Sequence, residues 1–162
     1  FTRNVVGPMD MTPVGFTIQK YPHQTTNSHE LALAVIFESG VLHFADGVSA
    51  YRNLPADPKQ YLKDVPNAWD NSKLIEGYPG KYTVVARKKA QDWYVAAINS
   101  ENAKKEISLA LDFLGGGKYK ALIIRDGKSK TSFLTERKTV SADDTIKITM
   151  PPKGGFSIQI LR

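Results

Sequence analysis

Two carboxylates, Asp10 and Asp46, are the side chains of this sequence best suited to acid–base chemistry. Asp10 follows a Gly-Pro-Met tripeptide in a segment broken by prolines, and Asp46 ends the short apolar run 41–45. A pair of carboxyl groups can hydrolyse a glycosidic bond when one acts as acid and the other as nucleophile or base. Each residue also suits a turn, and Asp46 opens an Asp-Gly turn. We therefore take Asp10 and Asp46 as candidates that lie near a substrate.

Other catalytic chemistries find less support in residue type and spacing. His23, His29 and His43 match no zinc-binding pattern, and residues 115–118 (GGGK) lack both the Walker spacing and a following helix. The sequence contains no Gly-x-Ser-x-Gly motif. It also contains no cysteine, which excludes disulfides, thiolate nucleophiles and zinc–thiolate sites. These exclusions leave the two carboxylates as the candidate site.

The positive charge of this sequence lies in its C-terminal part. Residues 1–50 carry two basic and four acidic side chains, a net charge of −2, so the rest of the chain must carry +8 to reach the total of +6. A basic face could bind nucleic acid, but these lysines are scattered singly and in pairs, as on a solvated surface. No run approaches the roughly 18 apolar residues of a membrane helix. We expect neither a nucleic-acid partner nor a membrane partner.

One helix is predicted over residues 28–39, with Asn27 as its cap, Glu30 three residues later and Gly40 at its end. Its side chains are apolar almost all round, so it needs burial on two sides. Fewer than fifty residues surround it before the composition changes, so we expect its partners to lie outside this chain. A short strand over 41–45 and an Asp-Gly turn follow, which is the rhythm of an α/β barrel.

From residue 68 onward the pattern is typical of an all-β domain. Prolines punctuate residues 51–68, with one helical turn expected over 58–62. The hairpin 78–99 has two strands that are apolar on both faces, which indicates a two-layer domain. Trp69, Trp93 and Tyr94 could stack on a sugar, but aromatic residues in such strands are more typical of a core. Strands are expected over residues 69–76, 81–87, 93–99, 106–111, 119–125, 131–133 with extension to 138, 145–150 and 156–161.

Several motifs, in order along the chain, resemble those of glycoside hydrolase family 97. They are residues 1–13 (FTRNVVGPMDMTP), 29–40 (HELALAVIFESG), 43–46 (HFAD), 65–70 (VPNAWD), 77–82 (GYPGKY), 86–87 (AR) and 93–95 (WYV). The resemblance covers essentially the whole chain. Met11 departs from the family pattern, which often has Tyr at this position.

The resemblance implies a fold and a place in a larger enzyme. Family members are α-glucosidases and α-galactosidases of Bacteroidetes, usually periplasmic, with an N-terminal β-sandwich, a catalytic (β/α)8 barrel and a C-terminal β-sandwich linked to oligomerisation. The chain is therefore expected to be mainly β, with a C-terminal antiparallel β-sandwich preceded by a helix-containing remnant of the barrel. The expected divisions are residues 1–52 for the barrel end, 53–66 for a linker and 67–162 for the sandwich.

The same resemblance implies which functional residues of the parent enzyme lie outside this chain. The catalytic carboxylates and the ligands of a Ca²⁺ ion lie upstream of residues 1–13 in the family, so we expect no catalytic residue, metal ligand or activity in this chain alone. Expected partners are an oligosaccharide substrate of the parent enzyme, the missing barrel and N-terminal domain, and a second copy bound through the sandwich. The alternative is a non-catalytic sandwich module for oligomerisation or carbohydrate binding.

Overall fold

Antiparallel strands form the larger part of the molecule, as predicted. The computed structural model describes residues 12–17 and 23–162. All the predicted strands after residue 68 are present, with ends that shift by at most a few residues. Their bounds are β1 (Asn71–Tyr78), β2 (Tyr82–Lys89), β3 (Asp92–Asn99), β4 (Lys105–Ala110), β5 (Tyr119–Asp126), β6 (Phe133–Val140), β7 (Thr145–Met150) and β8 (Gly155–Leu161).

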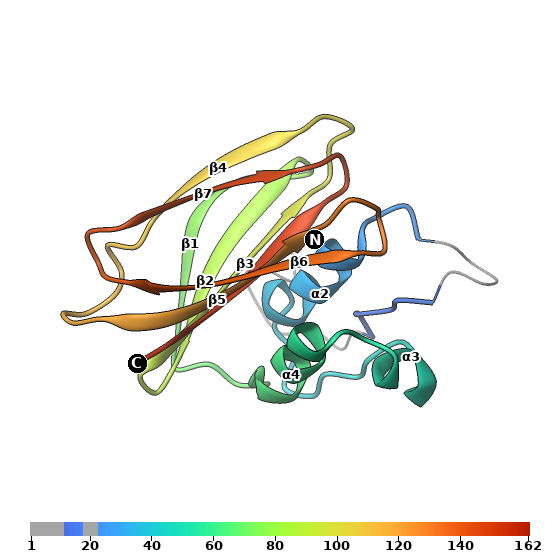
Figure 1. Cartoon of the computed structure of the whole chain (residues 1–162), viewed down its shortest axis with the longest axis horizontal. Coiled ribbons are helices and arrows are strands. Elements are labelled where there is room, and N and C mark those ends of the chain that lie inside the picture. The colour runs from blue at the N-terminus through green and yellow to red at the C-terminus, as the bar shows by residue number, and fades with distance from the viewer. Residues whose placement is uncertain (1–11, 18–22) are drawn as a thin grey trace.

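The strands make two layers (Figure 1). A six-stranded sheet has the order β1-β2-β3-β8-β5-β6, and β4 pairs with β7 in a second, two-stranded sheet. The alternation along β7 explains this arrangement, because Ile146, Ile148 and Met150 are buried while the residues between them are exposed. The buried side chains of β4 and β7 pack on the inner face of the larger sheet. These observations confirm the predicted β-sandwich.

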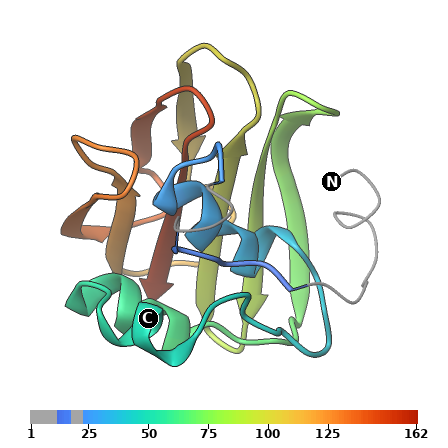
Figure 2. The same cartoon turned by 90° about the vertical axis from the view of Figure 1, so that its right-hand side faces the viewer.

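The outer face of the larger sheet is covered by helices, so its central strands are buried on both sides (Figure 2). On β2, Val84 belongs to the core between the two sheets and Val85 to a second core beneath the helices. The helices are α2 (Asn27–Ile36), α3 (Val48–Arg52) and α4 (Ala56–Asp64). None of the helices in residues 12–17 and 23–162 is long and apolar enough to cross a membrane.

Helix α2 is shorter than predicted and is capped by a different residue. Thr26, not Asn27, is the N-cap, and its hydroxyl accepts a hydrogen bond from the backbone N–H of His29 at 3.1 Å. The helix ends at Ile36 instead of residue 39, because the buried side chain of Arg87 binds its last carbonyl groups. Phe37 then continues in an extended conformation.

The expectation that α2 lacks partners in this chain was wrong. Nine of its ten residues are buried, and its apolar side chains pack on the outer face of the larger sheet. The residues that β3 and β5 contribute to this face are Tyr94, Ala96, Ile98 and Ile124. The prediction counted only residues close to α2 in the sequence. The face that covers α2 comes from strands that follow it by about fifty residues or more.

The expected barrel features before residue 53 are not confirmed. Residues 41–45 contain no strand, and in the described part of the chain they share one backbone hydrogen bond with the 12–17 segment, from Ala45 N to Pro13 O at 2.9 Å. One such bond does not make a ladder. The helical turn predicted over 58–62 is the nine-residue helix α4, which tolerates Pro58 in its first turn, where the missing N–H is not needed.

Candidate functional site

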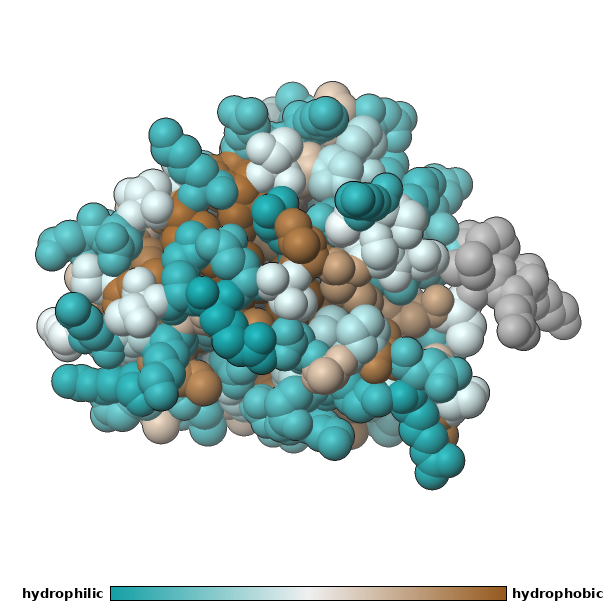
Figure 3. All heavy atoms as spheres, viewed as in Figure 1, coloured by the Kyte–Doolittle hydropathy of each residue, from teal (hydrophilic) through white to brown (hydrophobic). Residues whose placement is uncertain are grey.

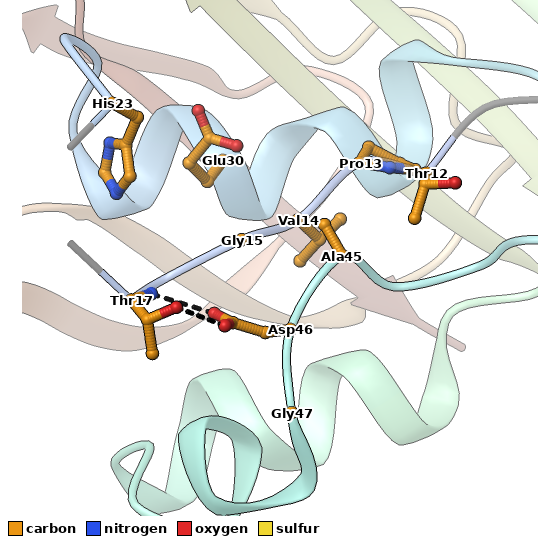
Figure 4. A pocket seen from close by; sticks show the side chains of 10 residues that line it. All are labelled: Thr12, Pro13, Val14, Gly15, Thr17, His23, Glu30, Ala45, Asp46 and Gly47. Carbon is orange, nitrogen blue, oxygen red and sulfur yellow. Dashed lines mark hydrogen bonds between the residues drawn. The ribbon is translucent and has the colours of Figure 1, made fainter. Parts of the chain in front are cut away.

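Asp46 joins two segments that lie far apart in the sequence (Figure 4). Its Oδ2 atom accepts hydrogen bonds from the backbone N–H groups of Phe16 at 2.5 Å and Thr17 at 2.8 Å, and its Oδ1 atom accepts one from the Thr17 hydroxyl. Partial burial raises the pKa of Asp46, but the hydrogen bonds from Thr17 and Phe16 outweigh it and hold that pKa below its usual range. Asp46 is therefore a carboxylate at neutral pH, and both of its oxygens are engaged.

Tyr51 strengthens the same junction. The backbone N–H of Asp46 donates to the Tyr51 hydroxyl at 2.9 Å, and this hydroxyl donates to the carbonyl oxygen of Val14 at 2.9 Å. Val14 is fully buried and has a φ of 70°. A β-branched residue in this left-handed region is strained, so the surrounding contacts must hold it there. The 12–17 segment is thus fixed in one conformation by Asp46 and Tyr51.

An open pocket of about 570 Å³ lies over this junction. Its lining includes Asp46 and Thr17 on one side and His23 and Glu30 on the other. The Nδ1 atom of His23 lies 2.9 Å from the carbonyl oxygen of Thr25, and the Thr25 hydroxyl donates to Glu30 at 2.5 Å. Figure 4 shows that the Glu30 carboxylate is turned away from Asp46. The two carboxylates therefore do not form a facing catalytic pair.

The sequence identified only part of this pocket. Asp46 lies in it as a candidate, and Asp10 lies outside the described residues. Tyr51, Thr17 and Glu30 were not expected, because their contacts join residues 5 to 37 positions apart without a motif. Glu30 did stand out as an expected capping residue, and its place one turn into α2 was the one signal that could have directed attention to it.

The described residues do not fit a calcium ion. A Ca²⁺ site needs six to eight oxygen ligands, several of them carboxylate. No group of three or more His, Cys, Asp or Glu side chains in residues 12–17 and 23–162 is arranged to hold a metal. The oxygens of Asp46 already accept N–H and O–H donors. No chemical step through a metal is therefore derived for the described part of this chain.

The aromatic residues considered for sugar stacking belong to the interior. Trp93 is buried, with its ring centroid 4.9 Å from that of Phe113. Tyr94 is buried and its hydroxyl donates to the carbonyl oxygen of Asp64 at 3.1 Å. Trp69 is partly buried and packs edge-on against Tyr94 at 5.4 Å. The interpretation of these side chains as core is confirmed, and they make no exposed platform.

A buried arginine fixes the carboxyl end of α2. Arg87 on β2 is 1% exposed, and its Nε donates to the carbonyl oxygen of Val35 at 2.7 Å. The two terminal nitrogens bind Ser72 at 2.6 Å, Glu38 at 3.0 Å and the carbonyl oxygen of Ile36 at 3.3 Å. A cation at this end of a helix is favoured, since the last carbonyl groups point toward it.

The amino end of α2 is held against the loop before β8. The Nδ1 atom of His29 lies 3.2 Å from the carbonyl oxygen of Gly154, and burial lowers the pKa of His29 to about 4. Asp126 accepts a hydrogen bond from the backbone N–H of Gly155 at 3.0 Å, and burial raises the pKa of Asp126. A Cβ atom on Gly155 would lie 2.7 Å from the Cα atom of His29, so only glycine allows this approach.

Comparison with known proteins places the chain in a family. Residues 68–161 match the family model described as glycosyl-hydrolase 97 C-terminal, oligomerisation. A probable retaining α-galactosidase of Streptomyces bingchenggensis is 32% identical over 97% of this chain and 24% of that protein. A retaining α-galactosidase of Bacteroides thetaiotaomicron is 32% identical over 99% of this chain and 26% of that protein.

Solved structures agree with these sequence matches. A glycoside hydrolase family 97 enzyme from Pseudoalteromonas in complex with panose superposes with a TM-score of 0.89 and 31% identity, over 96% of this chain and 26% of that chain. A β-arabinopyranosidase superposes with a TM-score of 0.84 and 27% identity, over 97% and 26% respectively. The chain spans about a quarter of the length of these relatives. It belongs to glycoside hydrolase family 97, of which it represents the C-terminal part.

Proposed function

We propose that this chain is the assembly part of an α-glycoside hydrolase that acts on α-linked galactosides or glucosides. The observation that carries this proposal is the similarity to two retaining α-galactosidases along nearly the whole chain. In this proposal the parent enzyme supplies its catalytic carboxylates, and the ligands of a Ca²⁺ ion, from residues that precede this chain. Its location in the periplasm is part of the same proposal and rests on the resemblance.

Galactose is the better supported sugar. Both curated relatives are named α-galactosidases, and one structural relative is a β-arabinopyranosidase. An arabinopyranose with the ring configuration of galactose lacks only the exocyclic hydroxymethyl group. One type of pocket can therefore accept both sugars, since a site discriminates weakly against a missing small group that it does not bind through hydrogen bonds.

In this proposal the pocket around Asp46 lies near the substrate and Asp46 shapes it without transferring a proton. Both oxygens of Asp46 accept hydrogen bonds, and its lowered pKa makes it a poor acid at neutral pH. Its role is then to hold the 12–17 segment in place. Asp10 stays a candidate for the same neighbourhood.

A non-catalytic module is the alternative function. The matching family model is described as an oligomerisation domain, and this role is compatible with the main proposal. Carbohydrate binding by the sandwich itself is less well supported, because Trp93 and Tyr94 are buried and Trp69 packs against Tyr94. The two functions differ in whether the chain must be joined to a catalytic domain.

A chimera tests the main proposal. The C-terminal quarter of the Bacteroides thetaiotaomicron retaining α-galactosidase is replaced by this chain, and hydrolysis of p-nitrophenyl α-galactoside and α-glucoside is measured with calcium present. We expect the chimera to hydrolyse the galactoside, and Asp46→Ala to lower its kcat/KM by about tenfold or more because the pocket wall is displaced. The isolated chain should be inactive.

Two results would contradict the proposal. Turnover by the isolated chain at enzyme-like rates would show that its own side chains perform the chemistry. A chimera that folds, assembles like the parent and hydrolyses neither substrate would show that this chain cannot complete such an enzyme. Circular dichroism and thermal unfolding of the chimera and its Asp46→Ala variant distinguish loss of activity from loss of fold.

A further inference from the structure

We propose that the edge of β1 that the other described strands leave unpaired is the surface through which two copies of this chain associate, about a two-fold axis between Leu74 and Ile75. This inference rests on the assembly role proposed above and names its surface. Strand β1 lies at one end of the larger sheet and pairs only with β2 among the described strands (Figure 2). Its other side carries backbone groups that an added strand could bind.

Exposed apolar side chains mark this edge. Leu74 is 60% exposed and Tyr78 is 59% exposed, and no other element of the described chain carries two large apolar side chains that are as exposed. Tyr78 has the ammonium group of Lys81 at 4.8 Å from its ring centroid. Tyrosine and large apolar residues surrounded by charges are typical of protein interfaces.

The charges on β1 complement those of a second, antiparallel copy. When all eight residues of β1 overlap in the two copies, Lys73 lies opposite Glu76 of the second copy, and the pair occurs twice because of the symmetry. The ammonium group of Lys73 lies 3.8 Å from Asp112 and 5.9 Å from the ring centroid of Phe113, and the Lys73 side chain stays 49% exposed.

A β-bulge allows Lys73 and Glu76 to face each other in this register. Residues three positions apart in a regular strand point to opposite faces of the sheet. In β1 the pairing with β2 shifts by one residue between Leu74 and Glu76, so Lys73 pairs with Ala86 and Glu76 pairs with Val84. Ala86 and Val84 both face the core between the two sheets. Lys73 and Glu76 therefore share one face, which opposite residues of an antiparallel pair require.

The other edge of the larger sheet is less suited to this contact. Strand β6 carries the consecutive charged residues Glu136, Arg137 and Lys138, a pattern that discourages edge pairing. Arg137 is already engaged, since its guanidinium group binds Asp57 on helix α4, at 3.2 Å for one of the two hydrogen bonds. Leu134 of β6 is less exposed than either apolar residue of β1.

Charge exchange across the two-fold axis tests the surface. The oligomeric state of the 162-residue chain and its variants is measured by sedimentation velocity over a range of protein concentrations. We expect the unmodified chain to be a dimer, and Lys73→Glu to raise the dimer dissociation constant by about tenfold or more, because two attractive pairs become repulsive. The double variant Lys73→Glu/Glu76→Lys restores the pairs and should restore the dimer.

Matched controls distinguish loss of the β1 contact from other causes of dimer dissociation. Leu74→Asp should also produce monomers, whereas Leu134→Asp on β6 should leave the dimer intact, and circular dichroism verifies that each variant is folded. A dimer that neither Lys73→Glu nor Leu74→Asp weakens would overturn the assignment to β1 and leave the assembly role standing. An unmodified chain that stays monomeric at all concentrations would overturn both, whereas the chimera assay above tests the glycosidase role alone.

Discussion

The buried imidazole of His29 should make the stability of this chain fall on acidification. His29 is 7% exposed, and burial lowers its pKa to about 4 from an ordinary value of 6.5. Because the folded state binds this proton more weakly than the unfolded state, the stability that the neutral ring provides is complete above pH 6.5. It is lost as the pH falls from 6.5 toward 4.

The size of the effect follows from the two pKa values. At 1.36 kcal/mol per pH unit, linkage predicts a loss from this group of about 2 kcal/mol at pH 5 and about 3 kcal/mol at pH 4. Asp126, whose pKa is raised by burial, acts in the opposite direction, because its folded state binds a proton more tightly than its unfolded state. Asp126 therefore offsets part of the loss from His29, whereas Asp46 and Asp57, whose pKa values are lowered, add to the loss as the pH approaches 4.

A variant isolates the contribution of His29. Urea unfolding of the chain and of His29→Gln is measured between pH 4 and pH 8, and the difference between the two free energies of unfolding is plotted against pH. Asp126 contributes to both curves, so the difference reports His29. His43→Gln, which replaces an exposed imidazole by the same amide, is the matched control for the substitution itself. Parallel curves for His29→Gln and the unmodified chain, or an NMR titration of His29 near pH 6.5, would refute the reasoning.

Three further substitutions probe the contacts around α2 and the pocket. Arg87→Met should lower the free energy of unfolding by about 2–4 kcal/mol in chemical denaturation, because the last carbonyl groups of α2 lose their buried donor; an effect below 1 kcal/mol would contradict this. Gly155→Ala should cost about 1–3 kcal/mol in the same assay, since the new methyl group would overlap His29, and an unchanged midpoint would contradict the close approach. Asp46→Asn should increase hydrogen exchange at the backbone N–H of Thr17, and unchanged protection there would show that the carboxylate does not hold the segment.

The sandwich was predictable because its signals are local. Ile146 and Ile148 alternate with polar residues along β7, and an alternating strand reveals its buried face without any knowledge of its neighbours. The apolar run 41–45 carries no such alternation, and sequence alone could not show whether a neighbouring strand would pair with it. In the structure this run shares one backbone hydrogen bond with residues 12–17, so it is not a strand.

The candidate site was less predictable, because its contacts are long-range. The Asp46 carboxylate was identified, but its donors lie about thirty residues earlier and the phenol of Tyr51 reaches back to Val14. Arg87 was quoted within a family motif, yet its role depends on α2, whose carbonyl groups lie about fifty residues before it. A single sequence carries no record of such pairs, since neither spacing nor periodicity links their members.

Helix α2 connects the proposed assembly surface to the pocket. Its apolar side chains pack on the sheet that ends in β1, and Glu30, on the same helix, lines the pocket. Arg87 and the contact of His29 with Gly154 fix its two ends to that sheet, so the helix cannot shift without disturbing buried hydrogen bonds. In each copy, α2 is held on the sheet that ends in β1. If two copies associate through β1, the positions of their two Glu30 side chains relative to each other are therefore fixed. Association would then fix the separation of the two pockets. Arg87 also binds Ser72 of β1, so Arg87→Met would loosen both the carboxyl end of α2 and its contact with that edge strand.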